Sequence, residues 1–168
     1  MSSYEIKVTT FEVPNYPEIV SEELFKAAVR TQNAWRDNLD QGRGALGSHG
    51  RPYVGTSEAI NRTVIYPEQP GEQAYEVVGE TLQHAIAEFG RQPGAKMPPH
   101  EPISEWAKLQ GLVPREGETW DDMVLNIRRH IAAHGLRAFA PGQLAADTIA
   151  PTVEPAIRAR IAELENKQ

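Results

Sequence analysis

The sequence predicts an α+β fold, in which a small, mainly antiparallel sheet packs against three or four helices, with an extended N-terminal strand or arm. Three patterns predict it: alternating polarity at the N-terminus, two β-rich runs around Pro70-Gly71, and several segments with apolar residues every three or four positions. The length of 168 residues and the hydrophobic content of 40% fit a single domain spanning residues 1–168. We expect its core at 18–165, behind an arm or strand at 1–17.

The elements of the N-terminal half follow from local patterns. The run YEIKVTTFEV, residues 4–13, alternates apolar and polar side chains as a strand does, and Pro14 and Pro17 end it. From about Glu18 to Leu39 the apolar residues recur at helical spacing, which predicts a long amphipathic helix. A short helical turn is expected at TSEAINR. The runs TVIYPEQ and QAYEVVG around Pro70-Gly71 predict a β-hairpin.

The C-terminal half is predicted to be mainly helical. The segment TLQHAIAEFG has Thr81 as its expected N-cap and Gly90 as its C-cap, and PISEWAKLQG follows as a second short helix. In TWDDMVLNIRRHIAAHG, Thr119 and Asp122 form a capping pair ahead of an apolar stripe. LRAFAPG is expected to be a short strand or an extended arm, and a last helix to span about 152–165. Residues 143–151 are assigned no element.

The three tryptophans are expected to share one core, because each lies on a predicted apolar helix face. In the helix 102–111 this places Ile103, Trp106 and Leu109 on the inner side. The other two tryptophans are Trp35 and Trp120.

Composition excludes several classes of protein. There is no cysteine, so disulfides, thiolate zinc sites and cysteine nucleophiles are excluded. The net charge is −6. Residues 1–84 contain 12 acidic and 7 basic residues, and residues 85–168 contain 11 acidic and 10 basic residues. This balance argues against a protein that binds nucleic acid tightly. The N-terminus shows no signal-peptide pattern and no apolar run approaches the ~20 residues that span a bilayer. We expect synthesis in the cytoplasm and no membrane partner.

Two patterns suggest chemistry but are explained more simply. Gly42, Gly44 and Gly47 match G-x-G-x-x-G, yet they follow a helix rather than a strand, which favours a mobile surface loop over a nucleotide site. His130 and His134 lie one helical turn apart, as two metal ligands would, but the residues between them are Ile-Ala-Ala, and the helix dipole accounts for both. We predict no catalytic, cofactor-binding or metal-binding residues and no enzymatic activity.

The segment EFGRQPGAKMPPHEP, residues 88–102, can neither continue a helix nor pair inside a sheet, because it holds four prolines and two glycines. With its flanks, HAIAEFGRQPGAKMPPHEPISEWAKLQG resembles a segment of the tail-completion or neck proteins of tailed bacteriophages. These are head–tail joining proteins of the minor tail or virion morphogenesis type. The matching letters are Ala87-Glu88, Gly90-Arg91, Pro93-Gly94, Pro98-Pro99, Pro102 and Trp106. The order of elements over about 18–165 is also similar to that family.

The resemblance implies a structural virion protein that forms a homo-oligomeric ring in the neck, completes the head–tail joint and lines the DNA channel. Its partners would be further copies of itself, a connector or head-completion protein on one side and a tail terminator or tail tube on the other. DNA would only pass through the channel as cargo and would not be a bound partner. A tail terminator or head-completion protein of the same neck is the alternative. From another class, a small metal-dependent hydrolase using His130 and His134 stays open.

The proline-rich segment is the predicted site. Proline fixes φ and so orders a loop before it meets a partner, while arginine can pair with a carboxylate on a neighbouring subunit. The predicted subunit-contact loop comprises Phe89, Gly90, Arg91, Pro93, Gly94, Lys96, Pro98 and Pro99. Glu88 and Trp106 are expected to support it.

Overall fold

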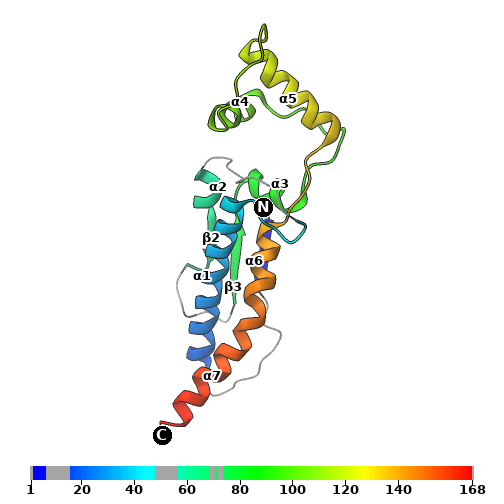
Figure 1. The fold of residues 1–168 in the computed structure, drawn as a ribbon. Helices are drawn as coiled ribbons and strands as arrows, with labels where there is room; N and C mark the ends of the chain where they lie inside the picture. The colour runs from blue at the N-terminus through cyan, green and yellow to red at the C-terminus, as the bar shows by residue number, and fades with distance from the viewer. Residues whose placement is uncertain (1, 7–15, 48–56, 69–70, 72–73, 168) are drawn as a thin grey trace.

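The computed structural model describes residues 2–6, 16–47, 57–68, 71 and 74–167. Its elements, in chain order, are β1 (Ser2–Ile6), α1 (Pro17–Gln41), α2 (Ser57–Asn61), β2 (Thr63–Tyr66), β3 (Tyr75–Gly79), α3 (Leu82–Phe89), α4 (His100–Leu109), α5 (Trp120–His134), α6 (Pro141–Ile149), the 3₁₀ turn η1 (Ala150–Thr152) and α7 (Val153–Glu165). Figure 1 shows an elongated body with a lobe carrying α4 and α5 beyond one end. We call residues 94–134 the distal lobe, residues 90–93 and 135–138 the connector, and the remaining described residues the body.

The sheet lies in the body and has the strand order β1-β3-β2, with both pairs antiparallel. The predicted hairpin is confirmed, since β2 pairs with β3 in a register that places Thr63 opposite Gly79. The predicted N-terminal strand is confirmed over residues 4–6 and begins already at Ser2, while residues 7–13 lie outside the described part of the chain. Helices α1, α2, α3 and α6 contact the sheet, so the α+β class with a small antiparallel sheet is confirmed.

Helix α1 supplies much of the core of the body, as its periodicity predicts. Leu24, Ala28, Trp35 and Leu39 are buried along one face, and the last two have no exposed surface. Fully burying a large apolar side chain stabilises a protein by about 1.5–3 kcal/mol. The helix ends at Gly42, whose left-handed φ of 62° lets its N–H donate to carbonyls of the last turn.

Helices α6 and α7 pack against α1 along its length, as Figure 1 shows. The last helix is confirmed. Residues 143–151, to which the sequence assigned no element, belong to α6 and η1, and Pro141-Gly142, expected at the end of a short strand or extended arm, already begin α6. Pro141 begins α6 because its fixed φ suits the first helical position, and Asn38 on α1 donates to the Pro141 carbonyl at 3.0 Å. Ala145, Val153 and Ile157 then join the main core cluster.

A buried polar network joins β2 to α3. His84 is fully buried, with Nε2 2.9 Å from Thr63 Oγ1 and Nδ1 3.3 Å from the backbone nitrogen of Thr81. Because a backbone N–H can only donate, Nδ1 accepts and Nε2–H donates, which describes a neutral imidazole. The Trp35 ring meets the imidazole edge-on at 5.4 Å between ring centres. Burial lowers the pKa of His84 to about 4.

The distal lobe has its own small set of buried side chains, separate from the main core cluster. Ser104 and Ala107 on α4 and Met123 and Val124 on α5 are buried, and small residues on α4 allow the two helices to approach closely. The Trp120 indole N–H donates to the Ser104 hydroxyl at 2.9 Å across the contact. The predicted capping pair at the start of α5 is confirmed.

The expectation of one core shared by the three tryptophans is wrong. Trp35 lies in the core of the body, and Trp120 is half-buried between the helices of the distal lobe. Trp106 is 36% exposed and Leu109 is 57% exposed. The cause is that α4 packs on α5 through its small residues, so that Trp106 and Leu109 stay exposed while Ile103 is half-buried.

Candidate functional site: the connector and the distal lobe

The predicted contact loop begins as one of the two chains of the connector. Arg91 and Leu136 form an isolated antiparallel bridge, in which each backbone N–H donates to the carbonyl of the other residue at 2.8 Å. The chain therefore leaves the body and returns to it at one place (Figure 1). The loop is held by a segment distant in sequence.

The proline-rich part then runs along α5. The Gly94 N–H donates to the Ala132 carbonyl at 2.7 Å, and Arg128 Nε donates to the Pro98 carbonyl at 2.7 Å. The Arg91 guanidinium donates to the Lys96 carbonyl within the segment itself. Prolines cannot donate backbone hydrogen bonds, so the segment is fastened mainly through its carbonyls and by arginine side chains.

Two glycines permit the close approach of the connector chains. Gly90 ends α3 and Gly135 ends α5, with φ values of 71° and 73° in the left-handed region. A Cβ at Gly135 would lie 2.1 Å from the Arg91 carbonyl oxygen, and one at Gly90 would lie 2.6 Å from the Leu136 carbonyl oxygen. Both positions therefore require glycine for conformation and for space.

The predicted contact residues differ in how much surface they offer. Phe89 is 67% exposed, which is unusual for a large aromatic side chain. Gly90 and Arg91 are half-buried, and Pro98 is buried beneath the segment. The exposed members are Phe89, Pro93, Gly94, Lys96 and Pro99.

Glu88 links the end of α3 to the start of α6. Its side chain is 3% exposed, and Oε1 accepts a hydrogen bond from the backbone N–H of Gly142 at 2.6 Å. A carboxylate at a helix N-terminus satisfies a free N–H and favours the positive end of the dipole. Ala140, just before α6, adopts a left-handed φ of 54°, and its N–H donates to the Ala87 carbonyl. The chain leaving the connector is thus fixed beside α3.

Most exposed large apolar side chains lie in the connector, in the distal lobe or beside them. Three belong elsewhere on the described surface: Leu46, Tyr66 and Leu82. Trp106 and Leu109 are exposed on α4, and Val113, in the irregular chain after that helix, is 80% exposed. The six in this region are Phe89, Met97, Trp106, Leu109, Val113 and Leu136. Such clustering is typical of surfaces that bind other proteins.

The glycine-rich loop after α1 is packed against the chain that enters α6. The Ala45 N–H donates to the Ala140 carbonyl and the Leu46 N–H to the Phe139 carbonyl, each at 3.1 Å. A Cβ at Gly44 would lie 1.7 Å from the Phe139 carbonyl oxygen. Close backbone packing explains Gly44, and the expected mobile loop is an ordered contact over residues 42–47.

His130 and His134 are adjacent on exposed turns of α5, with ring centres 4.4 Å apart. In the part of the chain that the structure describes, no group of three or more His, Cys, Asp or Glu side chains is placed to hold a metal ion. Elsewhere in the distal lobe, His100 Nε2 lies 3.3 Å from Asp121 Oδ1, which joins the start of α4 to the first turn of α5.

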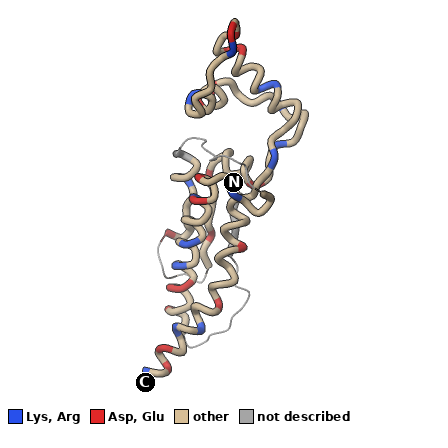
Figure 2. The backbone as a smooth tube through the Cα atoms, in the orientation of Figure 1, with Lys and Arg blue, Asp and Glu red and all other residues tan. Residues whose placement is uncertain are grey.

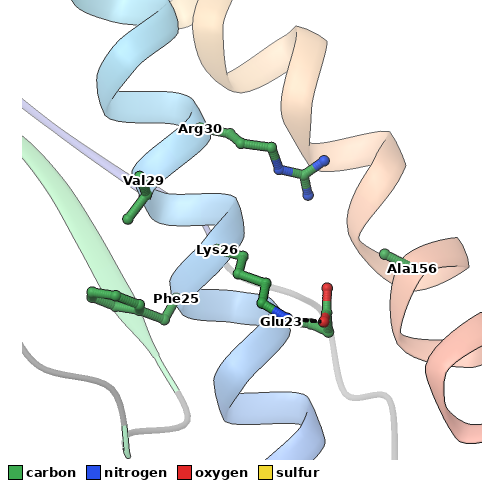
Figure 3. Close-up of a pocket in the computed structure, with 6 residues that line it drawn as sticks. All are labelled: Glu23, Phe25, Lys26, Val29, Arg30 and Ala156. Atoms are coloured by element: carbon green, nitrogen blue, oxygen red, sulfur yellow. Dashed lines mark hydrogen bonds and ion pairs between the residues drawn. The ribbon is translucent and has the colours of Figure 1, made fainter.

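A shallow groove of about 490 Å³ lies between α1 and α7 (Figure 3). Its lining includes Phe25 and Val29 from α1 and Ala156 from α7, with Arg30 reaching across it. Lys26 at its edge is paired with Glu23 at 2.8 Å.

No helix among the described residues is long and apolar enough to cross a membrane. Comparison with known protein families found no matching model, and comparisons with curated proteins and with solved structures found no match either.

Proposed function

We propose that this chain is a structural protein of the neck of a tailed bacteriophage. In this proposal several copies associate head to tail in a ring that completes the head–tail joint and lines the DNA channel. The role is non-enzymatic, and the protein is made in the host cytoplasm before it enters the virion. A tail terminator or head-completion protein is the alternative position within the same neck.

The observation that carries the proposal is the exposed apolar surface of the connector and distal lobe. It includes part of the segment 87–106, on which the resemblance to neck proteins rests, since Phe89, Met97 and Trp106 lie within that segment. Phe89 and Trp106 within that segment and Val113 beyond it are large and exposed, whereas a freely soluble monomer rarely exposes many such side chains on one part of its chain. The lobe also buries few side chains of its own, so docking on neighbours would stabilise it.

The net charge of −6 is compatible with a channel through which DNA slides. Affinity for DNA comes largely from lysine and arginine neutralising phosphates, so a channel wall with an acidic excess would not retain the passing strand.

The test is single-particle imaging of the purified virion or of its isolated neck. We expect a ring of density into which residues 16–47 and 74–167 can be traced. Removing the gene is expected to give DNA-filled heads and separate, unjoined tails. A complete neck traced without this chain, together with normal joining in its absence, would refute the proposal.

A further inference from the structure

The connector and the adjoining part of the distal lobe carry charge of one sign. Residues 89–100 and 123–138, which we call the basic region, contain five lysines and arginines and no aspartate or glutamate. The acidic residues that the structure describes all lie outside it. Figure 2 shows blue without red where the lobe joins the body. The five basic residues are Arg91, Lys96, Arg128, Arg129 and Arg137.

These five charges are not neutralised within the described chain. Arg91, Arg128 and Arg137 donate to backbone carbonyls, and none of the five forms an ion pair with a described residue. Hydrogen bonds to carbonyls hold the guanidinium groups in place and leave their positive charge uncompensated. The region is therefore a preorganised cationic surface.

The same region exposes apolar side chains. Phe89 is 67% exposed, Leu136 39% and Met97 37%. Apolar and arginine side chains together are typical of protein interfaces. A surface for nucleic acid would have a more continuous row of cations and would belong to a more basic chain. These features favour an acidic protein surface as the binding partner of the basic region.

The chain itself offers such a surface at the end of α1. Asp37 and Asp40 are exposed near the C-terminus of that helix, and the last turn holds no basic residue. Neither aspartate forms an ion pair with another described residue. A carboxylate near the negative end of a helix dipole is destabilising, and a cation docked beside it removes that destabilisation.

We infer that the basic region of one copy docks on the Asp37–Asp40 end of α1 of a second copy. The two surfaces differ, so the contact is head to tail and can repeat from subunit to subunit. This inference rests on the proposed function for its biological setting, and it names the partner surface of the predicted contact loop.

Cross-linking tests the inference directly, because the chain contains no cysteine. Lys96→Cys is mixed with Asp40→Cys, and the mixture is treated with a short bismaleimide. The matched control mixes Lys96→Cys with Ala159→Cys, since Ala159 is exposed on α7 at the far end of the body. Each variant is first shown to unfold at the wild-type urea concentration.

We expect the Lys96–Asp40 pair to give about tenfold more mixed dimer than the control pair, because complementary charges raise the rate and lifetime of the encounter. Adding Arg129→Glu to the Lys96→Cys variant is expected to lower that yield toward the control. Equal yields from the two pairs would overturn the inference. The inference would also be overturned if the wild-type protein bound a short DNA duplex, if Arg129→Glu abolished that binding, and if the two cross-linking yields were equal.

The virion experiment separates this inference from the proposed function. A neck ring that contains this chain but joins its subunits elsewhere would overturn the inference alone. Specific cross-linking of a chain that is absent from virions would overturn the proposed function alone.

Discussion

Lowering the pH from about 7.5 to 5 is expected to destabilise the body through His84. The folded protein holds this side chain as a buried, neutral imidazole with a pKa of about 4, against an ordinary value of 6.5. The unfolded chain therefore binds a proton at a higher pH than the folded chain does. Stability that is present above pH 6.5 is lost as the pH falls from 6.5 toward 4.

The size of the effect follows from the two pKa values. The difference in proton binding lowers the free energy of unfolding by about 1 kcal/mol at pH 6, about 2 at pH 5 and about 3 at pH 4. Urea unfolding followed by tryptophan fluorescence measures this loss. His84→Gln keeps a polar side chain at the site and removes the titrating group, so its unfolding free energy should fall by about 2 kcal/mol less between pH 7.5 and 5.

The reasoning would be refuted if the free energy of unfolding fell equally with pH in the wild type and in His84→Gln. If His84→Gln does not fold, the wild-type imidazole resonances decide the matter. The His84 ring protons should keep their chemical shifts down to about pH 5, because the group stays neutral there. A midpoint near pH 6.5 would show that the imidazole is not desolvated in the folded protein.

Two further comparisons test the connector and the distal lobe. Gly135→Ala should lower the free energy of unfolding by at least about 2 kcal/mol more than Gly94→Ala in urea unfolding, because both positions have positive φ but only the first would clash with the opposite chain. Similar losses in the free energy of unfolding for the two variants would show that the connector chains move apart easily to accommodate the added methyl group. Trp106→Ala should change stability by less than about 1 kcal/mol, whereas Trp120→Ala should cost about 2–3 kcal/mol, since only Trp120 fills the contact between the lobe helices. A larger loss at Trp106 would place it in a core, contrary to its exposure.

Local signals predicted the helices that have clear caps and a single apolar face. The start of α5 was marked by Thr119 with Asp122, and the two ends of α3 by Thr81 and Gly90. Capping depends on residues close in sequence, so such signals can be read locally. The sequence PGQLAADTI of α6 was missed because proline and glycine open it, and small alanines weaken its periodicity. Its start is set by Glu88 and Asn38, which are distant in sequence.

The sequence predicted a non-helical segment between α3 and α4 but not the contacts that hold it. The proline and glycine content of residues 88–102 indicated a rigid, non-helical segment, and local conformational rules are sufficient for that. The pairing of Arg91 with Leu136 is a contact between distant segments, and the sequence around Leu136 contains no pattern that predicts it. Trp106 was expected inside because periodicity identifies an apolar face without stating what covers it.

The bridge between Arg91 and Leu136 makes the intervening chain a self-contained insertion. Residues opposite each other in an antiparallel pair have Cα atoms about 4.5–5.5 Å apart, so a short turn can span the two ends. Evolution could lengthen, exchange or delete residues 92–135 while leaving the sheet and its covering helices unchanged. A lobe from a related protein could be grafted at the same junction, so the body can serve as a constant scaffold while the inserted part changes with the partner it meets.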